Sequence, residues 1–225
     1  MKKVVVLALI LIVPSVAYLL LQTGNNNYKK MEILGPKEPV RKTVNGKEVV
    51  DTIYHTVGGF SLLDADSNSV NQSITDGKIY VADFFFSTCK TICPKMSNQL
   101  MRVQHKFAAS DDVVILSFTV DPVNDTPSRL RAYANKHKAQ KGKWYFLTGE
   151  KDSIYNLARN SYFLNAMEDA SSGEGFLHSE QFLLIDKEKH IRGIYDGTNH
   201  FEVKKLMEDI AVLQKEYQDE AKAKP

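Results

Sequence analysis

The fold is decided by the stretch Ile79-Tyr80-Val81-Ala82-Asp83-Phe84-Phe85-Phe86-Ser87-Thr88-Cys89-Lys90-Thr91-Ile92-Cys93-Pro94. Its first eight residues form a nearly continuous apolar run, which is typical of a strand buried on both faces of a sheet. Pro94 suits the first turn of a helix, which we expect to continue to about Ala109. Two cysteines therefore lie where a buried strand passes into a helix, and open α/β sheets place their sites at such strand ends.

Working outward from this stretch, strand and helix patterns alternate along the chain. Asn45-Gly46 between β-branched residues predicts a β-hairpin ahead of the main domain. Thr126-Pro127 predicts a helix start, and Val203, Leu206, Ile210 and Leu213 form one apolar helical stripe. We expect further strands at 53–57, 60–63, 113–120, 144–147, 182–185 and 191–195, and helices at 126–137, 151–159 and 202–218. This order predicts an α/β fold with a mixed central sheet, parallel central strands and helices on both faces.

The N-terminus predicts export of the rest of the chain. Lys2-Lys3 precede residues 4–21, which carry no charge and are about long enough to span a bilayer as a helix. An uncleaved anchor is favoured over a signal peptide cleaved near Ser15-Val16-Ala17. We therefore expect a single-pass protein of a bacterial cytoplasmic membrane, with its domain facing the periplasm or exterior. The expected divisions are an anchor or signal at 1–21, a tether with the hairpin at 22–50, the main domain at 51–218 and a polar tail at 219–225.

The charge balance gives no reason to expect nucleic acid. Without Lys2 and Lys3, 27 basic residues face 27 acidic ones, because the full chain has 29 and 27. The densest basic group is the run Lys136-His137-Lys138 with Lys141 and Lys143, which we interpret as a solvated helix end and loop.

The two cysteines predict redox or metal chemistry. A disulfide closing three intervening residues would stabilise little, because the entropic gain rises with the length of the closed loop. Cys93 is expected at the helix N-cap, where backbone N–H groups and the helix dipole favour a thiolate. Lys90 and Lys95 add positive charge nearby.

His178 is the natural third member of this site. It precedes the predicted strand at 182–185, and the start of an antiparallel strand lies beside the end of its neighbour. Two thiolates and one imidazole suit copper, whereas structural zinc normally takes four protein ligands and no fourth is evident. The alternative for His178 is a surface-loop histidine bonded to backbone.

The remaining polar candidates have local interpretations. Asp121 follows the strand at 113–120 on the same side of the sheet, and it either hydrogen-bonds groups around the metal or simply forms a turn. Asp125-Thr126-Pro127 is interpreted mainly as helix capping. Five other histidines are each expected to be solvated: His55, His105, His137, His190 and His200.

These motifs together resemble the Sco/SenC family of copper-handling proteins. The matching stretches are 81–89 with Cys93-Pro94, 117–122 with 125–127, 144–149, and His178 ahead of 182–186. The resemblance covers roughly residues 52–215, and it implies a fold similar to thioredoxins and peroxiredoxins. It also implies that Cys89, Cys93 and His178 bind one copper ion, and that the protein assists assembly of the copper centre of cytochrome c oxidase.

The loop between the cysteines departs from the common family pattern. Many members carry Cys-Pro-Asp-x-Cys-Pro, and here Lys90 and Thr91 replace the Pro-Asp. This leaves two functions open: a copper metallochaperone, which is not an enzyme, or a thiol–disulfide oxidoreductase acting on the oxidase or other exported proteins. Peroxide reduction is least favoured, because Arg102 is the only arginine soon after the pair. The expected partners are the oxidase's copper-centre subunit and, through the N-terminal helix, the membrane, and we expect a monomer.

Overall fold

The computed structural model describes residues 12–16, 18, 30–44, 47–164 and 180–223. The chain forms two compact units, Met1–Lys30 and Met31–Pro225, and all strands and helices discussed below belong to the second. Residues 12–16 and 18 are helical. Among the described residues, no helix is both long and apolar enough to cross a membrane. Most of the anchor predicted at 1–21 lies outside the described residues.

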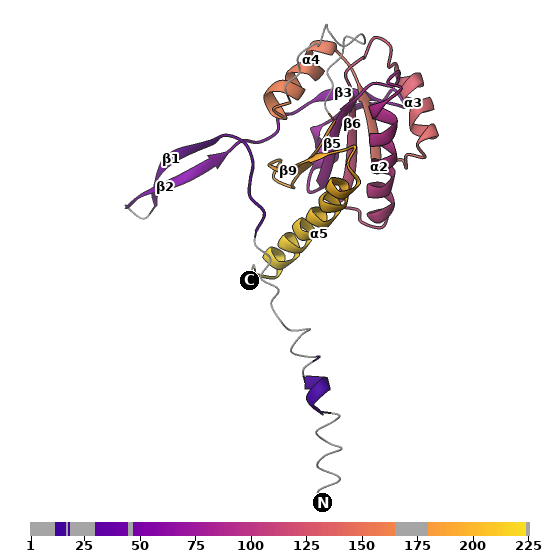
Figure 1. The fold of residues 1–225 in the computed structure, drawn as a ribbon. Coiled ribbons are helices and arrows are strands. Elements are labelled where there is room, and N and C mark those ends of the chain that lie inside the picture. Colours follow the sequence, from indigo (N-terminus) through magenta and orange to yellow (C-terminus); the bar gives the residue numbers. More distant parts are fainter. Residues whose placement is uncertain (1–11, 17, 19–29, 45–46, 165–179, 224–225) are drawn as a thin grey trace, which may run out of the picture. The chain divides into compact units, whose positions relative to one another are not determined.

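A seven-stranded mixed sheet forms the centre of the second unit (Figure 1). The apolar run at 79–86 forms its central strand β5 (Ile79–Phe85), as predicted. On one side β5 pairs in parallel with β6 (Val113–Thr119), and on the other it pairs antiparallel with β8 (Gln181–Ile185). The order is β4-β3-β7-β6-β5-β8-β9, with the outer strands β3 (Ser61–Asp64), β4 (Ser69–Asn71), β7 (Trp144–Thr148) and β9 (Ile191–Asp196).

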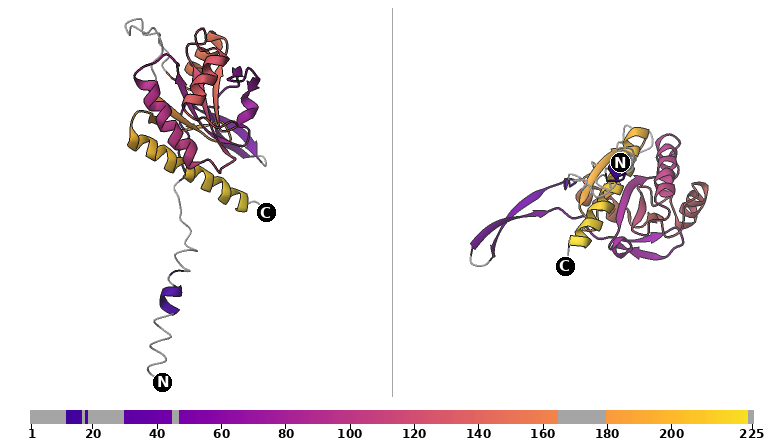
Figure 2. Two further views of the ribbon diagram at one scale, coloured as in Figure 1. Left: turned by 90° about the vertical axis from the view of Figure 1, so that its right-hand side faces the viewer. Right: turned by 90° about the horizontal axis from the view of Figure 1, so that it is seen from below.

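Helices cover both faces of this sheet, as predicted (Figures 1 and 2). One face carries α2 (Ile92–Lys106), α3 (Pro127–Lys136) and α5 (His200–Ala223). The other carries α4 (Lys151–Asn156) and a π-helical turn (Leu157–Ser161), and a 3₁₀ turn (Gln72–Thr75) precedes β5. Neighbouring residues of β5 show the two faces, because Phe85 packs on Tyr133 of α3 while Phe84 packs on Tyr162 after the π-helical turn.

The core forms where the central strands are buried on both faces. Every residue of β5 and β6 is buried. Phe84 and Phe118 stack across the two strands with ring centroids 5.1 Å apart, and each fully buried side chain of this size contributes about 1.5–3 kcal/mol. The predicted stripe of the last helix is also buried, at Val203, Leu206, Ile210 and Leu213. This packing fixes the ends of β5 and β6, from which the candidate site is built.

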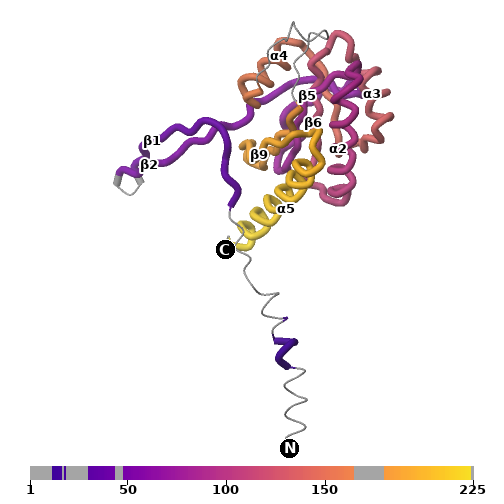
Figure 3. Tube along the Cα trace, viewed as in Figure 1, coloured from indigo at the N-terminus to yellow at the C-terminus, as the bar shows by residue number. Residues whose placement is uncertain are grey.

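The predicted hairpin forms a separate two-stranded sheet, β1 (Lys37–Val44) and β2 (Lys47–Tyr54) (Figure 3). It leaves apolar side chains in solvent, with Val50 66% exposed. The strand predicted at 53–57 is wrong, because residues 53–54 end β2 and residues 55–57 form no strand. Tyr54 instead leads into a connection held to the main sheet by the Val57 N–H, which donates to Lys189 O (2.9 Å).

Candidate metal centre

Cys89 sits in a tight turn directly after β5. Its N–H donates to the Phe86 carbonyl oxygen (3.2 Å), which closes the turn Phe86–Cys89. The Cys93 N–H in turn donates to Cys89 Sγ (3.4 Å), so the two cysteines are in contact. Both are buried, and neither is in a disulfide. The sequence-predicted pair is therefore assembled at the end of the central strand.

Helix α2 begins earlier than predicted. Its N-cap is Thr91 rather than Cys93, and Cys93 is the second helical residue, inside the first turn. Pro94 follows as the third residue, where the absent N–H costs nothing, because the first turn of a helix lacks internal acceptors. Cys93 therefore projects from the start of α2 while its own N–H is turned toward the Cys89 sulfur.

The two thiols differ in acidity. Burial acts to raise the pKa of Cys89, but hydrogen bonds from the backbone amides of Cys93, Thr91 and Ile92 outweigh it and lower that pKa. Burial raises the pKa of Cys93 strongly, and the charge on Cys89 raises it further. Cys89 is thus the sulfur that carries negative charge first, and Cys93 holds its proton.

A group of buried polar side chains links the three strands β5, β6 and β7. Trp144 Nε1–H donates to Ser117 Oγ (2.8 Å), whose hydroxyl donates to Asp83 Oδ1 (2.5 Å). Burial raises the pKa of Asp83 to about 7, although the Ser117 hydroxyl opposes the shift. The charge of Asp83 also contributes to the raised pKa of Cys93. Sequence reasoning missed Asp83, because one polar residue inside an apolar run gives no sign of its partners.

His178 lies outside the described residues, so its role as a ligand stays a prediction. The premise of that prediction holds, because β5 and β8 are antiparallel with Tyr80 opposite Ile185 and Ala82 opposite Leu183. Two residues further on, Gln181 at the start of β8 comes level with Phe84. The start of β8 therefore lies at the same edge of the sheet as the cysteines.

Asp121 takes the second of its two expected roles, that of a turn residue, whereas the capping role interpreted for Asp125 is wrong. Asp121 is buried, and its carboxylate accepts a hydrogen bond from Asn124 Nδ2 (2.9 Å) inside its own turn. Asp125, interpreted from the sequence as a capping residue, is fully buried and accepts from Ser87 N–H (2.9 Å), two residues before Cys89. No local sequence pattern could have revealed this long-range contact.

The histidines outside the predicted site are not all solvated. His137 is buried and its ring packs on Tyr133 (4.6 Å between centroids), which corrects the expectation of a solvated residue. The ring of His55 lies 4.4 Å from that of Phe163, and its Nε2 is 2.9 Å from Ser161 O. His105 is exposed, as expected.

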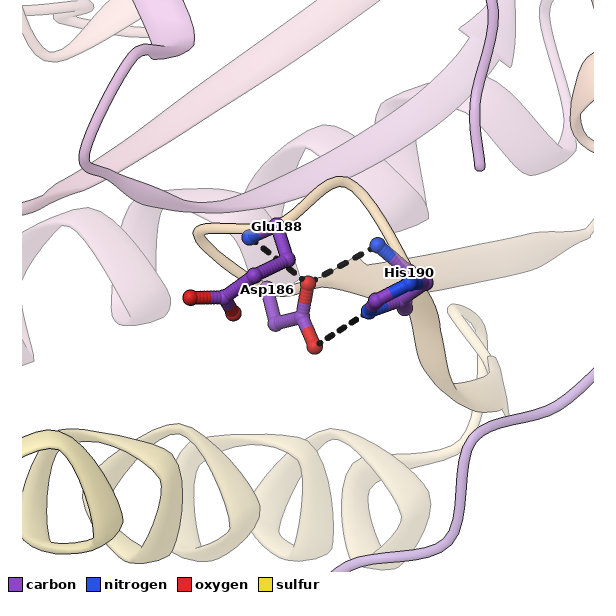
Figure 4. A group of neighbouring side chains, drawn as sticks. All are labelled: Asp186, Glu188 and His190. Atoms are coloured by element: carbon purple, nitrogen blue, oxygen red, sulfur yellow. Dashed lines mark hydrogen bonds and ion pairs between the residues drawn. The ribbon is translucent and has the colours of Figure 1, made fainter. Parts of the chain in front are cut away.

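A second cluster of potential metal ligands lies at the turn between β8 and β9 (Figure 4). Among the described residues it is the only such group of three, with ligand atoms of Asp186, Glu188 and His190 within 4.8 Å of one another. The Asp186 carboxylate is already engaged, because Oδ1 accepts from two backbone amides of the turn and Oδ2 from Arg192 Nη1 (2.9 Å). The positive charge of the Arg192 guanidinium disfavours binding of a cation here. We therefore interpret this cluster as a set of structural contacts that stabilise the turn.

Comparison with known proteins places this arrangement in a family. The family model described as SCO1/SenC matches residues 51–215. A SCO1/SenC family lipoprotein from Bacillus anthracis is 25% identical, with a TM-score of 0.65 over 71% of this chain and 95% of that one.

Two further solved structures are similar in sequence and fold. BsSco, described as a member of the Sco family of cytochrome c oxidase assembly proteins with a disulfide switch, is 29% identical (TM-score 0.62; 71% of this chain and 93% of that one). Arabidopsis thaliana ScoI, solved with copper bound, is 28% identical (TM-score 0.58; 72% and 99%).

Proposed function

Because the chain belongs to the SCO1/SenC family, we propose that it binds one copper ion and assists assembly of the copper centre of a cytochrome c oxidase. Cys89 and Cys93 would supply two sulfur ligands, and His178 would supply an imidazole nitrogen. The copper is cargo rather than a resident cofactor. The proposal follows the similarity to ScoI, which has been solved with copper, and to BsSco, which is described as an oxidase assembly protein.

The contact between the two reduced cysteines is the observation that carries this proposal. Both cysteines are buried, their sequence neighbours Lys90 and Lys95 are exposed, and the Cys93 N–H reaches Cys89 Sγ at 3.4 Å. Two thiolates on one turn suit a soft ion such as copper. Structural zinc would need four ligands, and the only three-ligand group among the described residues, around Asp186, lies at the opposite edge of the sheet.

Loading of the site is coupled to protons. Cys89 reaches the thiolate form readily because three backbone amides lower its pKa. Cys93, whose pKa is raised, has to release its proton when the metal binds. Binding of copper should therefore weaken as the pH falls, since protons compete for the same sulfurs.

A thiol–disulfide oxidoreductase is the second candidate, favoured by the same difference in acidity. The Cys89 thiolate would attack a client disulfide and form a mixed disulfide, releasing one client thiolate. Cys93, deprotonated, would then attack Cys89 Sγ and release the second client thiolate. Two electrons pass from the pair to the client, and a Cys89–Cys93 disulfide remains. The disulfide switch described for BsSco supports this alternative.

The location follows from the N-terminal segment and from the relatives. Residues 4–21 are uncharged, and one structural relative is described as a lipoprotein. We propose that the domain is exported and held at a bacterial cytoplasmic membrane by this segment. A fusion of a periplasmically active reporter to the C-terminus should be active, and an inactive fusion in intact cells would contradict export.

Replacement of His178 separates the two functions. His178→Ala removes the imidazole ligand but leaves the dithiol intact, and His105→Ala, which changes an exposed histidine on α2, is the matched control. A metallochaperone should lose copper affinity and oxidase activity together in His178→Ala alone. A thiol reductase should still reduce a client disulfide at nearly the wild-type rate and still support the oxidase. Unchanged copper affinity in His178→Ala would exclude the ligand role of this histidine.

A further inference from the structure

Asp125 joins the ends of the two central strands. Its carboxylate accepts hydrogen bonds from both the N–H (2.9 Å) and the hydroxyl of Ser87, beyond the end of β5. It also accepts from Thr119 Oγ1 (2.5 Å), the last residue of β6. The residue has no solvent exposure, so these contacts replace water. The carboxylate thus holds Ser87 and Thr119 at a fixed separation.

Ser87 is one of the two central residues of the turn that positions Cys89. The Cys89 N–H bonds back to the Phe86 carbonyl, so Ser87 and Thr88 are the central residues of that turn. A shift of Ser87 therefore moves Cys89 relative to Cys93, which is fixed independently by α2. No contact between Asp125 and either cysteine is needed for this effect.

Backbone hydrogen bonds fix the position of Asp125 within its own loop. Its N–H donates to Asp121 O (2.8 Å), and the next residue, Thr126, accepts from Leu130 N–H (2.9 Å) as α3 begins. Among the described residues, no ion pair involves Asp125. Burial of a carboxylate without a cation is costly. A turn alone would not require a buried carboxylate. A carboxylate has several acceptor positions, so it can accept hydrogen bonds from both donors of Ser87 and from the Thr119 hydroxyl.

We propose that Asp125 is a positioning residue that acts through Ser87 to set the place of Cys89 opposite Cys93. The expected effect on copper affinity rests on the proposed function. The expected effect on the position of Cys89 does not, because a displaced Cys89 also changes its thiol reactivity in the metal-free protein. Removal of the carboxylate should displace the Cys89 turn, whereas a neutral side chain of the same shape should keep it. Asn fulfils this condition, since its carbonyl oxygen can accept from Ser87 N–H and Thr119 Oγ1 while its amide donates to Ser87 Oγ.

The test compares Asp125→Ala and Asp125→Asn in the full chain. The matched control is Asp186→Ala, which removes another buried carboxylate with several donors at the opposite edge of the sheet. Copper affinity is measured by titration of the reduced protein, followed through its sulfur-to-copper absorption. Alkylation of Cys89 is timed in the metal-free protein by peptide mass spectrometry.

We expect Asp125→Ala to lose copper affinity by about tenfold or more, as is common when partners behind metal ligands are removed. Its alkylation rate at Cys89 should also change, and Asp125→Asn should restore both quantities to near wild-type values. Asp186→Ala should lose stability but keep both. Equal effects in Asp125→Ala and Asp186→Ala would overturn the proposal, as would wild-type copper affinity and alkylation in Asp125→Ala.

Ser87→Ala keeps the proposal testable if Asp125→Ala does not fold. This variant removes only the Ser87 hydroxyl and retains its N–H bond to Asp125. A smaller change in the same direction is expected, and no change in Cys89 alkylation would overturn the inference. If the wild-type chain binds no copper, the proposed function fails, while the alkylation comparison still decides the role of Asp125.

Discussion

Cys89 and Cys93 have nearly equal exposed fractions, 5% and 6%, and yet opposite pKa shifts. Burial acts to raise both pKa values and is the main cause of the raised pKa of Cys93, whereas at Cys89 hydrogen bonds from backbone amides outweigh it. Cys89 precedes the helix and accepts hydrogen bonds from backbone amides at its start, whereas Cys93 is part of the first turn and its pKa is raised further by the charge of Asp83. The charge of the helix start is thus directed at one sulfur of the pair.

Alkylation should distinguish the two thiols. In the reduced, metal-free chain, iodoacetamide should modify Cys89 before Cys93 at neutral pH. The Cys89 rate should rise with pH, and the midpoint of that rise should lie below 9.0, the ordinary thiol value, because its pKa is lowered. Cys93→Ser should keep the fast reaction and Cys89→Ser should lose it. Preferential labelling of Cys93 would show that the assignment is reversed.

Asp83 should make the stability of the reduced protein depend on pH. Its folded-state pKa of about 7 lies above the ordinary value of 3.8, so the folded protein favours the protonated form. Protonated Asp83 therefore makes its full contribution to the free energy of unfolding below pH 3.8. This contribution is lost as the pH rises through about 7. Asp83→Asn should match the wild type near pH 4 and exceed it at pH 8, by at most about 4 kcal/mol at roughly 1.4 kcal/mol per unit.

Urea unfolding at both pH values tests this expectation. The comparison isolates Asp83 in this range, because Cys93, whose pKa the Asp83 charge raises, keeps its proton in the folded protein at both pH values. A variant that is less stable than the wild type at pH 8 would show that the buried carboxylate is stabilised by more than Ser117.

Single residues were predictable where their chemistry depends on local spacing. The cysteine pair follows from its spacing and its place after an apolar run. The role of Asp125 does not, because its partner Ser87 lies 38 residues away. His137 was misjudged for a similar reason: its neighbours in sequence are lysines, but its ring packs on Tyr133.

At the scale of elements, the strands of the main sheet other than β4 lie within one residue of their predicted bounds. For β5 and β6 this agreement arises because complete burial leaves an unbroken apolar run. The three-residue strand β4 and the 3₁₀ turn at 72–75 were missed, because such short pieces carry no measurable periodicity. The extent of β2 was underestimated because its residues are mostly exposed and follow no burial pattern.

The hairpin should open far more readily than the main sheet. β1 and β2 pair only with each other among the described residues, and isolated two-stranded sheets are marginally stable in water. By hydrogen exchange we expect amides of β1 and β2 to exchange at least about 100-fold faster than those of β5 and β6. Protection of the hairpin equal to that of β5 would mean that another chain or segment covers it.

At the scale of the whole molecule, Arg192 holds three distant parts of the sequence together. Its guanidinium bonds Asp186 Oδ2 (2.9 Å), Glu216 Oε2 (2.9 Å) and the carbonyl oxygen of Met31 (2.7 Å). The Met31 N–H donates to the same Glu216 side chain (2.7 Å). The segment that follows the N-terminal unit is thereby bound to both β9 and α5.

Arg192→Ala should destabilise the protein strongly. It would leave the Asp186 and Glu216 carboxylates, which are 1% and 9% exposed, without their cation. Loss of one partner of a buried ion pair typically costs about 3–5 kcal/mol. Lys42→Ala, which breaks the exposed Lys42–Asp51 pair, is the control and should change the unfolding midpoint little. Similar midpoints for both variants would contradict the bracing role of Arg192.

The central feature of the proposed site is copper held by both cysteines of the pair. X-ray absorption at the copper edge, on the full chain loaded with one copper per molecule, tests this directly. We predict sulfur scattering from both Cys89 and Cys93, together with imidazole scattering that disappears in His178→Ala. Copper surrounded only by nitrogen and oxygen, or a sulfur signal unchanged in Cys93→Ala, would contradict the proposed site.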